Sequence, residues 1–263
     1  MNEITDNIRK SILHMVHYSK SSHVGTCLSI VEILYLLYFR VMNVDPTMPA
    51  KYDRDKFILS KGHGSAALYA TLAEKGFFPK TLLNRFYVDN GILPGHVDMT
   101  AVSGLEASAG SLGHGLSIGV GMAIANRQMG NSGKVYVLLG DGECNEGSVW
   151  EAVMLANQLR LDNLTAIVDF NSLQGFGYTK DVIDQQNLSE RWASFGWDAY
   201  DVGGHDVNEL EKTLLLPQQG PKVIIAHTVK GKGVSFMENE LEWHYKSPND
   251  EQYMQAIKEL ERA

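Results

Sequence analysis

Cysteine is scarce in this sequence, because its 263 residues include only Cys27 and Cys144. Two thiols this far apart indicate neither a disulfide framework nor a thiolate metal site. Long apolar runs are also missing, and the longest aliphatic and aromatic stretch, Ile33–Phe39, is far too short to span a bilayer. The first residues lack the basic segment of a secretion signal. From these absences we expect a soluble, cytoplasmic protein.

Basic residues do not predominate either. The chain has 23 Lys and Arg against 31 Asp and Glu, a net charge of −8, and no basic cluster that would bind nucleic acid. It lacks the GxxxxGK[ST] pattern of a P-loop, and the glycines of residues 113–121 lack the GxGxxG spacing, so neither nucleoside-triphosphate nor NAD binding is predicted. With 44 % hydrophobic residues, the chain can bury the core of one α/β domain spanning residues 1–263.

The central pattern is a strand, a helix and a second strand between residues 135 and 173. Val135–Leu139 (VYVLL) has the continuous apolar character of a buried strand and runs into Gly140-Asp141-Gly142. Residues 148–159 have the apolar spacing of a helix, and the strand Leu164–Phe170 then leads to Asn171. A crossover helix sets its two strands parallel. The pattern therefore predicts an α/β fold with a doubly wound, mostly parallel sheet and helices on both faces.

Asp141 and Asn171 should meet at the carboxyl edge of that sheet, where open α/β folds bind ligands. Carboxylate, amide and backbone carbonyl oxygens are ligands that Mg²⁺ accepts together with phosphate oxygens. A helix beginning near Glu146 would add free N–H groups that favour an anion. We expect the flanking glycines to allow positive φ and close approach of a ligand. Either polar residue alone could be a turn former, but together they predict a metal-bound diphosphate.

The stretch GDGECNEGSVWEA…DFN resembles the thiamin-diphosphate signature, and the surrounding sequence is similar to the amino-terminal, diphosphate-binding half of transketolases. The resemblance implies thiamin diphosphate and a divalent metal (Mg²⁺, or else Ca²⁺ or Mn²⁺) held by Asp141, Asn171 and the Leu173 carbonyl. It also gives Glu146 a role in organising a dimeric active site. The implied cofactor-binding positions are His63, Leu112, Gly140, Asp141, Gly142, Glu146, Asn171 and His244.

Histidines beside glycine-rich turns match further family segments. The segments SxHxG, LSKGHG and PGH and a loop near the carboxyl end carry His23, His63, His96 and His244. In transketolases such histidines line the channel to the cofactor, and imidazoles there can move protons of substrate hydroxyls near neutral pH. Val97 replaces the second Pro of the family's PGHP. His114 replaces a Gln, which leaves open whether it only packs or also contacts the cofactor.

The other basic candidates have no such match. We interpret Lys230 as a solvated lysine rather than a phosphate neighbour. Four further histidines are expected to be structural or solvated, namely His14, His17, His205 and His227. None of these five residues is therefore predicted to take part in the chemistry.

The sequence ends soon after His244, in residues 250–262 that read as one charged helix. Enzymes with this cofactor normally use a Glu from a pyrimidine-binding domain, which in a full-length transketolase follows this one. The resemblance thus implies a partner subunit with the carboxyl-terminal half of transketolase, in a heterotetramer with two copies of each chain. Together they would move a two-carbon ketol unit from a ketose or its phosphate to an aldose.

Three alternatives remain open. The chain could be a non-catalytic cofactor-binding subunit, a 2-oxoacid dehydrogenase subunit, or part of a 1-deoxyxylulose-phosphate synthase. The LSKGHG and PGH segments favour transketolase over the other two enzymes, and the retained acidic, amide and histidine positions argue against a decayed site.

Overall fold

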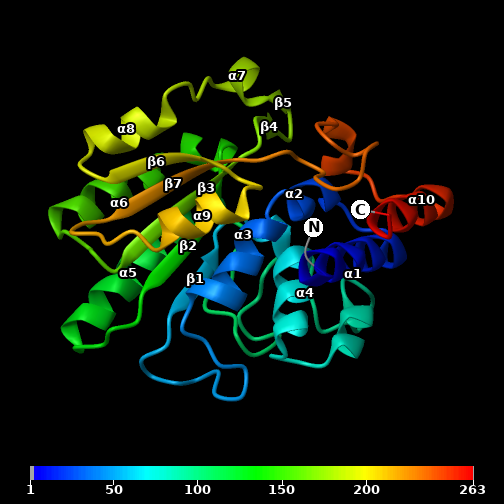
Figure 1. Cartoon of the computed structure of the whole chain (residues 1–263), viewed down its shortest axis with the longest axis horizontal. Coiled ribbons are helices and arrows are strands. Elements are labelled where there is room, and N and C mark those ends of the chain that lie inside the picture. The colour runs from blue at the N-terminus through cyan, green and yellow to red at the C-terminus, as the bar shows by residue number, and fades with distance from the viewer. Residues whose placement is uncertain (1–2, 263) are drawn as a thin grey trace.

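The computed structural model describes residues 3–262, which form a central sheet between two layers of helices (Figure 1). The sheet has five strands in the order β1-β2-β3-β7-β6, and every neighbouring pair is parallel. The strands are β1 (Lys56–Leu59), β2 (Val135–Gly140), β3 (Leu164–Phe170), β6 (Asp198–Gly203) and β7 (Lys222–His227). The predicted parallel α/β fold is confirmed.

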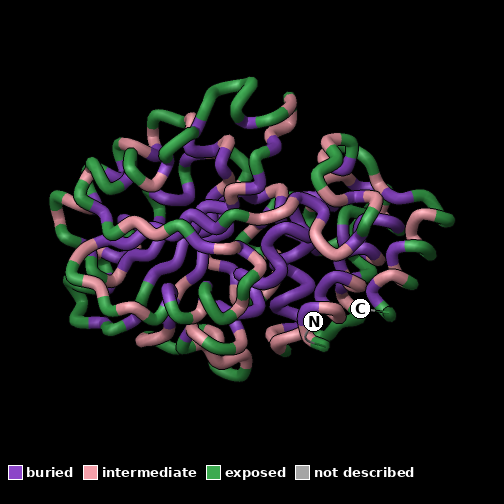
Figure 2. Tube along the Cα trace, turned by 45° about the horizontal axis from the view of Figure 1, so that its top comes forward, coloured by how far each residue is buried: buried purple, intermediate pink, exposed green. Residues whose placement is uncertain are grey.

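Alternate residues of each strand supply two separate buried clusters, one on each face. In β2, Tyr136 and Leu138 belong to the first cluster, whereas Val137 and Leu139 belong to the second. On the first face the buried cluster also takes in side chains of α1 (Glu3–Ser19), α2 (Val24–Leu28), α3 (Val31–Leu36), α4 (Ser65–Lys75), α9 (Val207–Leu214) and α10 (Asp250–Leu260). The second is covered by α5 (His114–Gln128), α6 (Gly147–Gln158) and α8 (Leu188–Ser194). Figure 2 shows the buried residues concentrated between these layers.

Short elements connect the larger ones. A π-helical turn, η1 (Leu37–Val41), continues α3. A two-stranded antiparallel hairpin of β4 (Leu173–Gln174) and β5 (Gly177–Tyr178) follows β3. The remaining short elements are η2 (Gly62–Gly64), η3 (Lys80–Arg85), η4 (Gly142–Asn145), α7 (Thr179–Val182) and η5 (Leu241–His244). Within residues 3–262 we find no helix with the length and apolar character needed to cross a bilayer.

Several predicted helix boundaries are wrong. The sequence of residues 29–38 predicts a single helix, whereas the structure has α3 continued by η1 there and a separate helix, α2, before it. The sequence predicts a helix over Met122–Gln128, but α5 begins eight residues earlier, at His114, directly after Gly113 with its left-handed φ of 84°. The polar sequence of residues 81–90 likewise predicts a helix, but the only helical segment there is the 3₁₀ turn η3.

The register of the sheet explains how the two halves of the signature meet. Gly140, the last residue of β2, pairs with Asp169 of β3. The backbone N–H of Asp141 donates to the carbonyl of Asp169 at 3.2 Å. The chain then leaves both strands on the same edge, so Asp141 and Asn171 emerge side by side as the crossover topology predicts.

Candidate active site

A pocket of about 520 Å³ lies at the carboxyl edge of the sheet. Its lining includes all the residues that the sequence singled out: His23, His63, His96, Leu112, Gly140, Asp141, Gly142, Glu146, Asn171, Leu173 and His244. The structure thus brings together segments from both ends and the middle of the chain, while the role of each residue in binding stays a prediction.

Asp141 is buried in the wall of this pocket and is only 3 % exposed. One carboxylate oxygen accepts from the Gly142 N–H at 2.8 Å, and the other accepts from the Ser172 N–H and the Thr179 hydroxyl, both at 2.8 Å. Burial raises the pKa of Asp141 above its ordinary value, and these hydrogen bonds offset the effect only in part. A divalent cation beside the carboxylate would stabilise its charged form.

Asn171 and Leu173 contribute the next two oxygens. The Asn171 side-chain oxygen accepts from the Leu173 N–H at 3.1 Å, which fixes the start of the β4–β5 hairpin over the pocket. The Leu173 carbonyl accepts from Lys230 Nζ at 2.8 Å. A side-chain carboxylate, a side-chain amide and a main-chain carbonyl therefore lie on one wall, which is the donor set expected for Mg²⁺.

The prediction that Lys230 is solvated is wrong. It was expected to be solvated, yet it is 1 % exposed and lines the pocket. Its Nζ contacts the Leu173 carbonyl and lies 3.0 Å from His244 Nδ1. Burial, together with the nearby Lys61 charge, lowers the pKa of Lys230 to about 8. Lys230 follows β7 at the edge of the sheet where ligands bind, and this place in the sequence was the signal that could have identified it.

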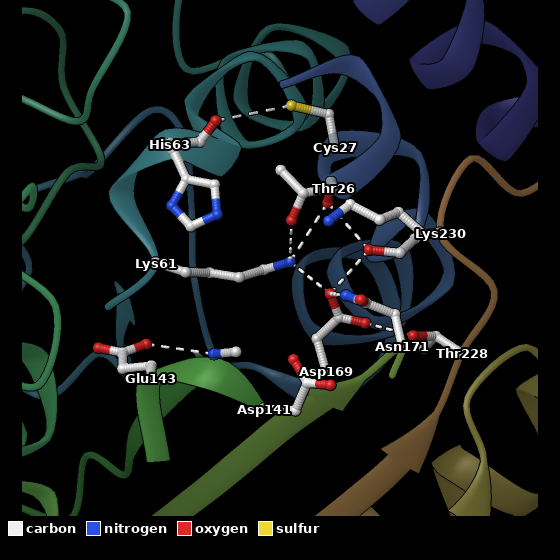
Figure 3. A network of polar contacts seen from close by, with 12 residues as sticks. Thr26, Cys27, Lys61, His63, Asp141, Glu143, Asp169, Asn171, Thr228 and Lys230 are labelled. Atoms are coloured by element: carbon white, nitrogen blue, oxygen red, sulfur yellow. Dashed lines mark hydrogen bonds and ion pairs between the residues drawn. The ribbon is translucent and has the colours of Figure 1, made fainter. Parts of the chain in front are cut away.

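Beneath the pocket lies a buried ion pair that the sequence did not reveal (Figure 3). Lys61 is 1 % exposed and Asp169 is fully buried, and the Lys61 ammonium contacts the Asp169 carboxylate. Lys61 Nζ also donates to the Thr26 carbonyl at 3.2 Å and hydroxyl at 2.8 Å. Burial alone would raise the pKa of Asp169, but the Lys61 charge and the hydrogen bonds lower it overall. Lys61 and Asp169 thus form an ionised pair beneath the site.

Glu143 is a further buried residue that sequence analysis did not identify. It is 2 % exposed, and its carboxylate accepts from the Gly113 N–H at 2.8 Å, from the Gly140 N–H at 3.1 Å and from the Ser60 hydroxyl. Burial raises the pKa of Glu143. The residue joins three segments of the pocket wall and directly follows the GDG motif, three residues before Glu146.

The glycines of the GDG motif act differently from the prediction. Neither Gly140 nor Gly142 has a positive φ. A Cβ on Gly142 would instead lie 2.9 Å from the side chain of Gln174, so glycine is needed there for close approach of the hairpin. The expected positive φ is therefore wrong for both residues, and the close approach of a ligand to them stays a prediction.

Four imidazoles gather in the same pocket. The ring centroid of His23 lies 5.1 Å from that of His244, 5.2 Å from His63 and 5.9 Å from His96. His23 adopts a left-handed φ of 73°, an uncommon conformation for this residue, and its N–H donates to the His244 carbonyl at 3.1 Å. The strained backbone conformation of His23 thus directs its imidazole into the pocket.

Three of these rings, those of His23, His63 and His244, are held in the neutral form. Burial, reinforced by neighbouring His96 and Lys230, lowers the pKa of His23 to about 4. Burial and then Lys230 lower the pKa of His244 to about 3, and burial lowers that of His63 as well. Neutral imidazoles can both accept and donate hydrogen bonds, which suits the handling of substrate hydroxyl protons.

We expect the ring resonances of His23 and His244 to stay at their neutral positions between pH 7.5 and 5.5. A pH titration followed by NMR, with assignments from His23→Gln and His244→Gln, measures this directly. Because the unfolded chain binds protons at the usual pKa of 6.5, the stability that these rings contribute is present above that pH and is lost as the pH falls toward about 4. Titration of either ring near pH 6.5 in the folded chain would contradict the assigned burial.

Two predicted contacts occupy the rim of the pocket. Glu146 is exposed at the N-terminus of α6, and its side chain makes no capping hydrogen bond there. Leu112 is partly buried just before α5. His114, left open by the sequence, is exposed and is not part of the pocket lining, so the structure gives it no contact with the site.

The remaining histidines have structural contacts, as expected. His17 lies 2.9 Å from the Pro248 carbonyl through Nδ1 and stacks on Tyr253. His205 accepts from the Val229 N–H at 2.8 Å and contacts Glu32. The other two are at the surface, where His14 lies 2.9 Å from Asn84 and His227 pairs with Asp201.

Two observations test whether these residues fit a metal-bound diphosphate. Gln174 lines the pocket, and its buried Nε2 has no hydrogen-bond partner within residues 3–262, so it leaves a donor free for an anionic oxygen. In the same part of the chain no group of three His, Cys, Asp or Glu side chains could hold a metal by itself. A cation here would need additional oxygens, which a diphosphate supplies. The residues of this pocket therefore fit a metal-bound diphosphate.

Comparison with known proteins agrees with this geometry. The family "Transketolase, thiamine diphosphate binding domain" matches residues 1–260. One subunit of an apulose-4-phosphate transketolase from Phocaeicola vulgatus is 42 % identical over 255 residues, covering 96 % of this chain and 90 % of the relative. A 6-deoxy-6-sulfo-D-fructose transketolase subunit from a Clostridium species is 41 % identical over 258 residues, covering 97 % and 94 %.

Longer relatives match over part of their length. Human transketolase is 36 % identical over 263 residues, which cover 99 % of this chain and 42 % of the human protein. The solved structure of Leishmania mexicana transketolase superposes with a TM-score of 0.92 at 28 % identity, covering 98 % of this chain and 41 % of that one. The predicted resemblance to the amino-terminal part of transketolases is confirmed, and the chain belongs to the transketolase family, of which it contains the thiamine-diphosphate-binding domain.

Proposed function

We propose that this chain is the amino-terminal subunit of a two-chain transketolase that moves a two-carbon ketol unit from a ketose to an aldose. The observation that carries the proposal is the composition of a single pocket. The pocket presents the oxygens of Asp141, Asn171 and Leu173 together with four imidazoles. A site for a metal-bound diphosphate thus faces groups suited to polyhydroxylated substrates.

The residues of this chain would divide the work between them. Asp141, Asn171 and the Leu173 carbonyl would hold Mg²⁺, and Gln174 Nε2 would donate to the diphosphate. When bound, thiamin diphosphate supplies the carbon nucleophile that breaks and forms the C–C bond. His23, His63, His96 and His244 would hold the substrate and accept or return protons at its hydroxyl oxygens.

A partner subunit is expected to complete the pocket. Phe176, at the tip of the β4–β5 hairpin, is 88 % exposed, and the nearby Ile183 is 57 % exposed, although both line the pocket. Large apolar side chains at the rim of a ligand site indicate a surface that another protein covers. Relatives of similar length are named as single subunits of transketolases, which supports a second chain. A cytoplasmic heterotetramer with two copies of each chain is our working assembly.

The names of two relatives indicate a substrate class. One acts on a phosphorylated and the other on a sulfonated sugar, according to their names. We therefore extend the proposal to a donor ketose with an anionic group at the end remote from its carbonyl. The two lysines of this pocket are committed to inner contacts with Asp169 and Leu173. The partner is accordingly expected to contact that anionic group.

Mixing the chain with a carboxyl-terminal transketolase subunit tests this function. We expect calorimetric binding of thiamin diphosphate with Mg²⁺, and ketol transfer only when both chains are present. Binding without transfer to any aldose would favour a non-catalytic subunit. Decarboxylation of a 2-oxoacid in place of ketol transfer would contradict the proposed reaction, as would full turnover by the isolated chain.

A further inference from the structure

Asp169 is the acceptor on which the polar network beneath the pocket converges (Figure 3). Its Oδ2 accepts from the Ser29 hydroxyl at 2.7 Å and from Asn171 Nδ2 at 2.8 Å. The same oxygen contacts the Lys61 ammonium. Its Oδ1 accepts from the Thr228 hydroxyl. Every one of these neighbours donates, so a carboxylate is the group that satisfies them all.

This acceptor determines which way the Asn171 side chain faces. An amide has one donor end and one acceptor end. Because the Asp169 carboxylate can only accept, the NH₂ group of Asn171 turns toward it. The side-chain oxygen of Asn171 is thereby left on the opposite side, where it already accepts from the Leu173 N–H. Rotating the Asn171 amide by half a turn would place its Oδ1 against the Oδ2 of Asp169, where neither atom can donate a hydrogen bond.

We propose that Asp169 is a positioning residue that holds the Asn171 amide with its oxygen toward the metal side of the pocket. The inference rests on the proposed function, because a divalent cation needs an oxygen, not an NH₂ group, at this place. Asp169 is fully buried and does not line the pocket, so it acts through Asn171. Partners that orient metal ligands in this way are as necessary to a metal site as the ligands themselves.

The test compares two variants of equal charge. Lys61→Met combined with Asp169→Asn keeps an acceptor oxygen beside Asn171, whereas Lys61→Met combined with Asp169→Leu removes it. Both lack the buried ion pair, so any contribution of Lys61 to ligand binding cancels between them. We expect the Leu variant to bind Mn²⁺ about 10- to 100-fold more weakly than the Asn variant. Mn²⁺ binding is followed by electron paramagnetic resonance with thiamin diphosphate present.

A second readout does not depend on the metal. The side-chain NH₂ protons of Asn171, assigned by their absence in Asn171→Asp, are expected to exchange slowly with solvent in the wild-type chain and in the Asn variant. They should exchange quickly in the Leu variant. Rapid exchange in the wild-type chain would overturn the inference even if neither double variant folded.

The two readouts separate the inference from the function beneath it. Equal Mn²⁺ affinity of the folded Asn and Leu variants would overturn the role of Asp169 and leave the proposed function standing. Failure of the wild-type chain to bind Mn²⁺ with thiamin diphosphate would count against the proposed function. In that case the exchange of the Asn171 amide alone decides whether Asp169 holds it.

Discussion

Asp141→Asn is expected to reduce ketol transfer by the assembled enzyme more than about 100-fold, because even partners one step removed from a metal cost 10- to 100-fold. The substitution removes the one carboxylate proposed to bind the cation. It leaves an oxygen that can accept from Ser172 and Thr179, which hold the carboxylate in place. The loss should therefore come from the missing charge and not from a misplaced loop.

Thermal unfolding gives the direct measurement of this effect. A ligand that binds only the folded chain raises its melting temperature. Mg²⁺ with thiamin diphosphate should therefore raise the melting temperature of the wild-type chain but not that of Asp141→Asn. Asp201→Asn is a matched control, because Asp201 is exposed and pairs with His227 at the surface. Retention of the Mg²⁺-dependent shift in Asp141→Asn would refute the assignment of this residue to the metal.

Lys61→Met is expected to destabilise the chain by about 3–5 kcal/mol, because it leaves the Asp169 carboxylate buried and unpaired. For a domain of this size the melting temperature would fall by roughly 10 °C. The loss should be smaller in acid, where protonation of Asp169 removes the unpaired charge. Urea unfolding at two pH values measures both effects.

Two controls isolate the buried charge as the cause. Lys246→Met disrupts the exposed pair of Lys246 with Glu242 at 2.8 Å, and such pairs contribute less than about 1 kcal/mol. Adding Asp169→Asn to Lys61→Met removes the unpaired charge and should restore much of the lost stability. A double variant as unstable as Lys61→Met alone would show that lost packing of the lysine stem is responsible.

The sequence was most informative where a local pattern determines position. A continuous apolar strand followed by GDG, and a second strand ending at Asn171, placed the metal side of the pocket because parallel strands end on one edge. The histidine segments were located through their resemblance to a family. Periodicity alone would not have distinguished them from surface turns, since four rings gathered from distant loops leave no local signal.

The buried charged residues could not be identified from the sequence. Lys61, Lys230 and Glu143 look like solvated residues beside glycine-rich turns, and only their neighbours in three dimensions reveal otherwise. Lys61 is paired by an aspartate from another strand, and Glu143 by backbone N–H groups from two other segments. The start of α5 was misplaced for a related reason, because Gly113 lies against Ser148 and Glu146, which are remote in sequence and leave no room for a Cβ.

The link between the first and last loops of the chain has a further consequence. The His23 N–H reaches the His244 carbonyl, and the Gly231 N–H reaches the Gly25 carbonyl at 2.9 Å. Contacts between such remote segments form late, since closing a long loop costs entropy before any contact repays it. A nascent polypeptide that still lacks Gly231 and His244 would have no ring of imidazoles to offer. Binding of a polyhydroxylated substrate by all four imidazoles would accordingly require a chain that has been synthesised and folded at least as far as His244.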